Sequence, residues 1–135
     1  MEKGQTQRKP SVDGISIVPT TSKNFIRSWL EIMHPFHHLA PREMDFAAAM
    51  LEKRYEIAQN VSDQILIDKL LFEEESKESI REKVGITRAH MQTILRKMRE
   101  NGVLNGKRFN IQYVPEWEKG KPFRMVFVFK NQDET

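Results

Sequence analysis

Two glycines bracket the segment that most constrains how this chain can fold. Between Gly85 and Gly102, Thr87 is a residue type that caps helices, and glycine is the residue type that most often ends them. The spacing predicts a helix from Thr87 to about Asn101. On such a helix four apolar side chains fall within about 100° of arc and form a buried stripe, namely Met91, Ile94, Leu95 and Met98.

Other helical patterns precede this segment. A first helix begins near Phe25 and ends at Pro35, and a second runs from Pro41 to about Asn60 with Arg54 among its polar positions. Ser62 is expected to cap the next helix, whose apolar run 65–71 predicts the central helix of the core. A further short helix is expected from about Ser76 to Gly85, with Ile80 and Val84 as its apolar positions.

The C-terminal region has the alternation of β-strands. Residues 109–114 and 123–129 alternate apolar and polar or aromatic side chains, and the basic loop 115–122 contains Pro115, Gly120 and Pro122. We therefore expect a two-stranded hairpin with a long loop. The predicted class is α+β, mainly α, a domain of about four helices, counted from the one that begins at Pro41, followed by this hairpin.

Chain length and composition set the domain organisation. Residues 1–24 are polar and interrupted by glycine and proline, so we expect an extended arm in which 15–18 could pair as an edge strand. Residues 25–130 form the folded domain and 131–135 a polar tail. With 135 residues and no cysteine, the chain excludes large two-domain enzymes, disulfides and thiolate chemistry. We expect no signal peptide, no membrane span and no small-molecule substrate.

Charge is distributed unevenly along the chain. Residues 42–76 hold nine acids and four Lys or Arg, net −5, whereas residues 77–130 hold five acids and thirteen Lys or Arg, net +8. This asymmetry fits a basic surface that meets phosphates, or complementary faces that meet in a head-to-tail assembly. A solvated surface with uneven charge is the third interpretation.

The predicted order of short helix, glycine turn, longer helix and hairpin is similar to that of a known protein family. Residues 79–104, with Ile86 in the turn and Gly102-Val103-Leu104 leading onward, resemble the helix-turn-helix of the winged-helix superfamily. The resemblance implies that the second helix enters the DNA major groove, with His90 and Lys97 flanking the base-reading face. The base-facing positions would be Arg88, Ala89, Gln92, Thr93 and Arg96, and the residues contacting phosphates from the wing would be Lys107, Arg108, Lys119, Lys121 and Arg124.

The same scaffold also binds proteins in many winged-helix modules, because fold does not dictate function. The acidic run Glu73-Glu74-Glu75 just before the motif would repel phosphate if it lay nearby, and it would suit a basic protein surface. Both interpretations stay open at this point.

A narrower resemblance covers about two thirds of the chain. The stretch from Asn24-Phe25-Ile26 through residues 39–46, the acidic 72–76 and Gly102-Val103-Leu104 is similar to small winged-helix-like proteins of crAss-like tailed bacteriophages of gut bacteria. It implies a virion protein that forms rings at the portal or neck, made as a homo-oligomer and bound to other virion proteins. This chain departs from that pattern in the basic face of the helix 87–101, which such a role does not require. The residues expected to dock on partners are Phe25, Trp29, Phe36 and Trp117.

Residues with catalytic or metal-binding chemistry are sparse. His34, His37 and His38 surround Pro35 and Phe36, with Glu31 one helical turn before His34, but clustered histidines in a loop are more often incidental, so no metal site is expected. We find no phosphate-binding glycine loop, nucleophile elbow or zinc-protease motif. The sequence therefore predicts a non-enzymatic protein without a cofactor, and the resemblance to crAss-like phage proteins implies that it is a virion assembly protein, assembled in the host cytoplasm. The alternative is a cytoplasmic regulator that binds double-stranded DNA through the helix 87–101.

Overall fold

The computed structural model describes residues 9–12 and 15–132, and these residues are mainly helical. Predictions for residues 1–8, 13–14 and 133–135, which belong to the expected arm 1–24 and tail 131–135, lie outside the described residues. In chain order the elements are β1 (Lys9–Val12), β2 (Ile15–Ile17), α1 (Phe25–Ile32), α2 (His34–His37), α3 (Pro41–Ala58), α4 (Gln64–Leu71), α5 (Glu74–Val84), α6 (Arg88–Glu100), β3 (Leu104–Asn105), β4 (Arg108–Phe109) and the short 3-10 helix η2 (Ile111–Tyr113).

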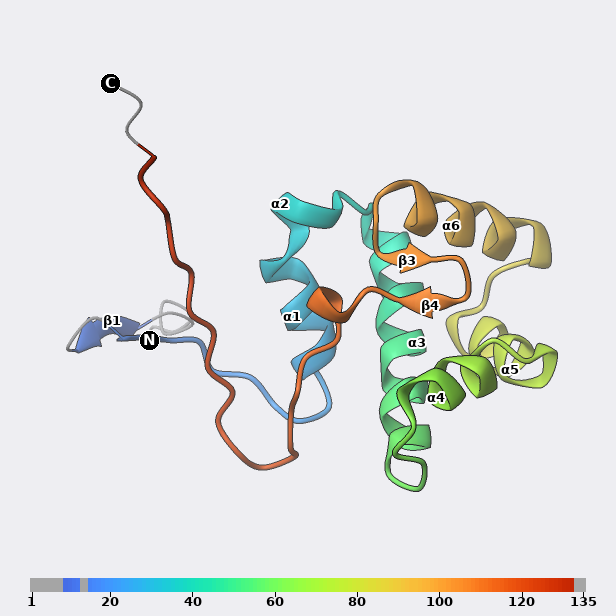
Figure 1. Ribbon diagram of the computed structural model, residues 1–135, viewed down its shortest axis with the longest axis horizontal. Helices are drawn as coiled ribbons and strands as arrows, with labels where there is room; N and C mark the ends of the chain where they lie inside the picture. The colour runs from blue at the N-terminus through green and yellow to red at the C-terminus, as the bar shows by residue number, and fades with distance from the viewer. Residues whose placement is uncertain (1–8, 13–14, 133–135) are drawn as a thin grey trace, which may run out of the picture.

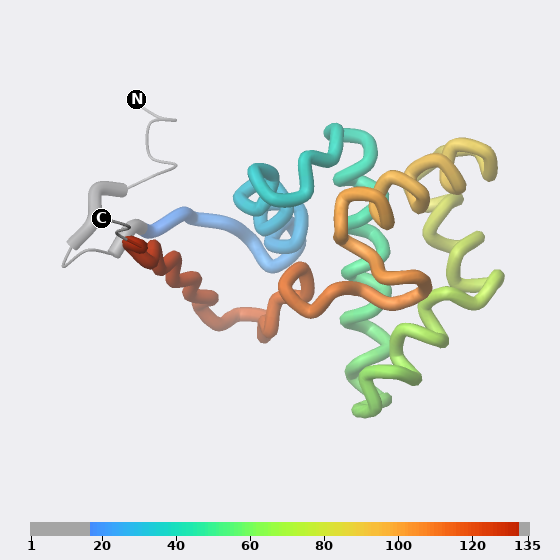
Figure 2. The backbone as a smooth tube through the Cα atoms, turned by 45° about the horizontal axis from the view of Figure 1, so that its top comes forward, coloured from blue at the N-terminus to red at the C-terminus, as the bar shows by residue number. Residues whose placement is uncertain are grey.

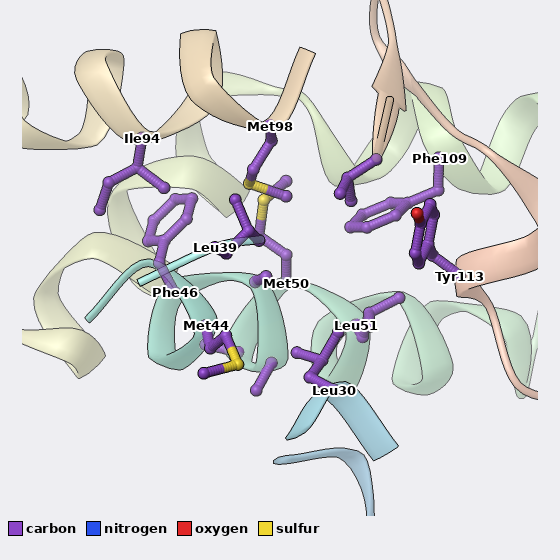
Figure 3. Packing of buried hydrophobic residues seen from close by; sticks show 14 of the residues in the cluster. Leu30, Leu39, Met44, Phe46, Met50, Leu51, Ile94, Met98, Phe109 and Tyr113 are labelled. Atoms are coloured by element: carbon purple, nitrogen blue, oxygen red, sulfur yellow. The ribbon is translucent and has the colours of Figure 1, made fainter. Parts of the chain in front are cut away.

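Helix α3 is the centre of the fold. It packs against α1 on one side and against α4 and α5 on the other, as Figure 1 shows. Phe46 and Met50 of α3 are fully buried, and Ile94 and Met98 of α6 lie above them in Figure 3. One continuous apolar core therefore joins α1, α3, α6 and the residues around η2.

Local signals explain where α3 begins. Pro41 occupies the first turn, where its missing N–H costs no helical hydrogen bond, and the Ala40 N–H donates to Glu43 Oε1 at 2.8 Å. Glu43 also places a negative charge at the positive end of the helix dipole. The start predicted at Pro41 is therefore confirmed.

The α5–turn–α6 unit also follows the sequence prediction. Gly85 ends α5 with φ +80°, a left-handed conformation that suits glycine, and Ile86 of the turn is buried. The Thr87 side-chain oxygen accepts a hydrogen bond from the His90 N–H at 3.0 Å. Gly102, with φ +79°, turns the chain after α6. All four residues of the predicted stripe are buried, namely Met91, Ile94, Leu95 and Met98.

The prediction that residues 65–71 form the central core helix is wrong. In α4, Ile65 is 61% exposed and Leu66 is 40% exposed, and only Ile67, Asp68 and Leu71 are buried. This helix of eight residues packs one side on α3 and β4, so its other side faces solvent. Its N-cap is Asp63 rather than Ser62, because the Asp63 carboxylate accepts from the backbone N–H groups of the first turn.

The predicted hairpin of strands 109–114 and 123–129 is also wrong. The hairpin that forms is shorter and earlier: Leu104 pairs with Phe109, and Asn105 with Arg108, in antiparallel register. Two hydrogen bonds join the residues just before and just after the two strands. The Asn110 N–H donates to the Val103 carbonyl at 3.0 Å, and the Asn110 side-chain amide donates to the Gly102 carbonyl. The chain then enters η2, and 123–129 are extended without a partner strand among the described residues.

The two ends of the described chain extend from the α1 side of the helical core, away from α5 and α6 (Figures 1 and 2). The N-terminal arm contains the antiparallel pair β1–β2, so the strand expected at 15–18 is present as Ile15–Ile17. We call residues 115–132 the C-terminal arm. Among the described residues, no helix combines the length and apolar character that crossing a bilayer requires.

Candidate interaction surfaces

The first candidate surface is the α6 face, defined as Arg88, Ala89, Gln92, Thr93 and Arg96. All five side chains are exposed, as the helix-turn-helix resemblance requires of a face that reads bases. The buried stripe on the other side of α6 holds the helix on the core. The α6 face is therefore presented by a firmly packed helix.

Acidic side chains surround the N-terminal end of that face. Arg88 Nε donates to Glu78 Oε2 at 3.1 Å, and Arg81 Nη2 donates to Glu78 Oε1 at 2.9 Å. These hydrogen bonds, from Arg81 and then Arg88, lower the pKa of Glu78 to about 2. The pKa of Arg88 is raised, first by its bond to Glu78 and then by the charges of Glu78, Glu74 and Glu82. The arginine best placed to enter a groove thus lies among carboxylates.

The rest of the α6 face is partly engaged within the helix. Arg96 Nε lies 3.7 Å from Glu100 Oε2, and the Thr93 hydroxyl donates to the Ala89 carbonyl at 3.1 Å. The Arg96–Glu100 pair is exposed and worth little to stability, so it opens easily. Gln92 and Arg96 are therefore the members of this face most available to a partner.

The predicted wing residues do not form one surface. Lys107 and Arg108 lie at the β3–β4 turn, between α6 and α4. Lys119 and Lys121 lie instead in the C-terminal arm, where Trp117 and Phe123 on either side of them pack on α1. The structure therefore does not bring Lys119, Lys121 or Arg124 to the α6 face, because the chain crosses to the α1 side after η2 (Figure 1).

The residues predicted to dock on partners also separate into groups. Phe25 and Trp29 are buried, and both contact Phe123 in edge-on geometry with ring centroids 5.1 and 5.6 Å apart. Trp117 stacks on Phe25 at 4.8 Å and leans on Tyr55 at 4.9 Å. These three predicted docking residues are thus occupied by the chain itself. Phe36 remains 53% exposed on α2.

Beyond Phe123, the C-terminal arm exposes large apolar side chains in succession. Phe123 and Met125 still pack against the core, but from residue 126 the chain leaves it. The exposed fractions are 75% for Val126, 56% for Phe127, 76% for Val128 and 92% for Phe129. In the N-terminal arm, Ile17 is 59% exposed and Val18 is 47% exposed. Apolar side chains thus gather on both arms, which is unusual for surfaces in contact with water alone.

A buried ion pair was missed by the sequence prediction. Arg54, expected at a polar position of α3, is buried and donates from Nε to Asp68 Oδ1 of α4 at 2.9 Å. Its Nη2 donates to Gln64 Oε1, also at 2.9 Å. The available signal was Asp68 within the apolar run 65–71, because a charge in such a run requires a partner when it is buried. The pair joins α3 to α4.

The histidine cluster is structural in character. His37 is fully buried, its Nε2 lies 2.8 Å from the Leu30 carbonyl, and its Nδ1 accepts from the Leu39 N–H at 2.9 Å. Nδ1 must be unprotonated to accept, so Nε2 carries the proton and His37 is neutral. Burial is the main cause that lowers its pKa, and His34 and His38 add charge repulsion. Within residues 9–12 and 15–132, no group of three histidine or acidic side chains is arranged to hold a metal ion.

An open cleft of about 400 Å³ lies between α3, η2 and the C-terminal arm. Its lining combines Tyr55, Gln59, Ile111 and Trp117 with Arg54, whose guanidinium is already bonded to Asp68 and Gln64. The cleft brings together no nucleophile with a base and no pair of free carboxylates. The exposed surfaces, rather than this cleft, are the candidates for function.

Comparisons of this chain with protein-family models, with curated proteins and with solved structures gave no match.

Proposed function

We propose that this chain is a non-enzymatic assembly protein that binds neighbouring protein subunits, copies of itself included, through its two arms. The observation that carries the proposal is the run of four exposed apolar side chains from Val126 to Phe129. Each such side chain gains about 1.5–3 kcal/mol when it is fully buried, so the run favours contact with another surface. The exposed apolar residues of the N-terminal arm add to the same side of the molecule.

The resemblance to proteins of crAss-like phages suggests the kind of particle in which this assembly occurs. We infer a virion protein of the portal or neck ring type, made in the host cytoplasm and bound to further virion proteins. The uneven charge along the chain supports contacts between unlike faces of adjacent copies, since a ring is built from head-to-tail contacts.

The test is molar mass in solution by light scattering, for the full chain and for variants that lack residues 1–22 or 126–132. We expect the full chain to be an oligomer and both truncated chains to be monomers that unfold at nearly the same temperature as the full chain. The helical core is expected to survive both truncations, because none of the described residues among those removed belongs to the buried core cluster. An oligomer that both truncations leave unchanged contradicts the proposal.

A matched pair of substitutions separates the arm from exposed apolar residues in general. Phe129→Ser removes an exposed side chain from the arm, and Ile65→Ser removes one from α4 on the core. We expect Phe129→Ser to weaken the oligomer on the order of tenfold or more, because an interface residue of this size contributes more than about 1.4 kcal/mol. Ile65→Ser is expected to leave the molar mass unchanged.

The second candidate is a regulator that binds double-stranded DNA, and the observation that favours it is that all five residues of the α6 face are exposed. Gln92 and Arg96 have side chains suited to base edges, with Lys107 and Arg108 at the nearby hairpin. The carboxylates around Arg88 count against it, because they repel phosphate.

Titration of a 30-base-pair duplex at low and high salt separates the two candidates. A regulator binds with a steep salt slope, and Arg96→Ala then costs about 1–3 kcal/mol at one base position, whereas Lys107→Ala weakens all sequences alike. Under the assembly proposal the molar mass is indifferent to the duplex.

A further inference from the structure

The segment Met125–Phe129 has the properties of a β-strand without a sheet. It contains no helix or turn and runs away from the core as an extended trace in Figure 1, and no partner strand is paired with it among the described residues. Side chains alternate between the two faces of a strand, so Val126 and Val128 share one face and Phe127 and Phe129 the other. Apolar side chains on both faces are typical of strands that are covered on both sides.

A complementary feature lies in the N-terminal arm. The β1–β2 pair is a two-stranded sheet, and the outer edge of each strand has no strand beside it among the described residues. An isolated two-stranded hairpin is marginally stable in water, and a third strand is the usual remedy. The chain thus contains both an unpaired strand and an unfilled sheet edge.

The two outer edges of this hairpin are not equivalent. Pro10 lies in β1, and proline has no N–H to donate to an added strand. Strand β2 contains only Ile15, Ser16 and Ile17, so every residue keeps its N–H. The free edge of β2 is therefore the better acceptor.

We propose that the segment Met125–Phe129 of one copy adds as a third strand to the free edge of β2 in a second copy of this chain. This inference rests on the proposed function and names the partner surface within it. The occupant is a second copy because each chain carries both halves of the contact, and because the segment makes no such ladder with its own β2. Main-chain hydrogen bonds would supply affinity, and the alternating side chains would set the register.

The absence of native cysteine makes the pairing directly measurable by disulfide trapping. A chain with Ile17→Cys is mixed in turn with five chains that each carry one cysteine, at positions 125 to 129. Cysteines cross-link only when their Cβ atoms come within about 4.5 Å, which in a strand pair requires the same face. We expect the yield of mixed dimers to peak at the one position directly opposite residue 17 and to be on the order of tenfold lower at its neighbours, whose side chains point to the other face.

Two controls belong to this experiment. Ile65→Cys is equally exposed but lies on α4 of the core, and it is expected to give a low and even yield with all five partners. The double variant Ile17→Cys/Val128→Cys at high dilution reports pairing within one chain. Trapping in the double variant but not between mixed chains overturns the proposal, because the strand would then add to its own hairpin.

The remaining outcomes separate this inference from the proposed function. An oligomer that depends on the arms but cross-links evenly at positions 125 to 129, or not at all, overturns strand addition and leaves the assembly function standing. A full chain that is monomeric at every concentration overturns both. A yield between mixed chains that peaks at one of the five positions supports both.

Discussion

The helical core and the C-terminal arm use the same kind of residue in opposite ways. In the core, Phe46 of α3 has no exposed surface, because α6 closes over it. In the arm, Phe129 is 92% exposed and touches no packed element. Apolar side chains therefore stabilise the fold in one region and remain available to a partner in the other. Trp117 and Phe123 mark the boundary between the two uses.

The largest effect expected from this contrast is in the core. Phe46→Ala should lower the free energy of unfolding by roughly 3–5 kcal/mol, because it removes buried surface and leaves a cavity. Phe129→Ala, the matched change in the arm, should alter the free energy of the monomer by less than about 0.5 kcal/mol. Urea unfolding of both variants at low protein concentration measures the difference. A comparable loss in the two variants would show that the arm is packed in the monomer.

The next effect concerns the ion pair that joins α3 to α4. Asp68→Ala leaves the buried Arg54 guanidinium without its carboxylate, so we expect a loss of roughly 3 kcal/mol. Glu100→Ala removes the partner of the exposed Arg96 and serves as the control, with a loss below about 1 kcal/mol. Urea unfolding at pH 7 measures both. Equal losses would mean that burial does not decide the strength of these pairs.

A smaller effect is expected where the arm is anchored. Trp117→Ala removes the stacking on Phe25 and the contact with Tyr55, which should cost about 1–2 kcal/mol because Trp117 is only half-buried. Trp117→Phe should recover most of this loss. Urea unfolding followed by circular dichroism gives both values, and the fluorescence of the remaining Trp29 reports whether its cover by Phe123 is lost. An unchanged free energy of unfolding would show that the contacts of Trp117 with the core do not stabilise the fold.

The smallest effect is a dependence of stability on pH. Burial lowers the pKa of His37 below the ordinary value of 6.5, so the unfolded chain binds a proton near pH 6.5 that the folded chain resists. Stability is therefore fully present above about pH 6.5 and falls as the pH decreases below it. Urea unfolding at a series of pH values should show this slope in the native chain. His37→Gln should flatten it, whereas the exposed His34→Gln should keep it.

Local patterns predicted the part of the fold that depends on local interactions. The caps, stripe and ends of α6 follow from residues 85–102 alone, because capping and helical spacing act within a few residues. The exposed α6 face was predicted for the same reason. The Arg54–Asp68 pair was missed, since it joins two helices whose relative position no local pattern contains.

The errors share one cause. The alternation of 123–129 shows that the segment is suited to a strand, but a strand also needs a neighbour, and alternation does not identify one. In the structure the hairpin forms instead through the short pairing of Leu104 with Phe109, and the chain after η2 lies on the α1 side. Lys119, Lys121 and Arg124 belong to this part of the chain, so they do not lie beside α6 as predicted. The apolar content of residues 65–71 likewise indicates a helix that buries side chains, but it does not indicate on how many sides other elements pack against that helix.

The contact between Phe25 and the pair Trp117 and Phe123 brings nearly the two extremes of the folded chain together. The loop that it closes spans almost the whole domain, and the entropic cost of closing a loop grows with its length. During synthesis, α1 leaves the ribosome long before the residues that cover it exist. The cover over Phe25 is therefore completed only after residue 123 has emerged. A chain truncated before that point would leave the apolar surface of α1 open to every other nascent copy.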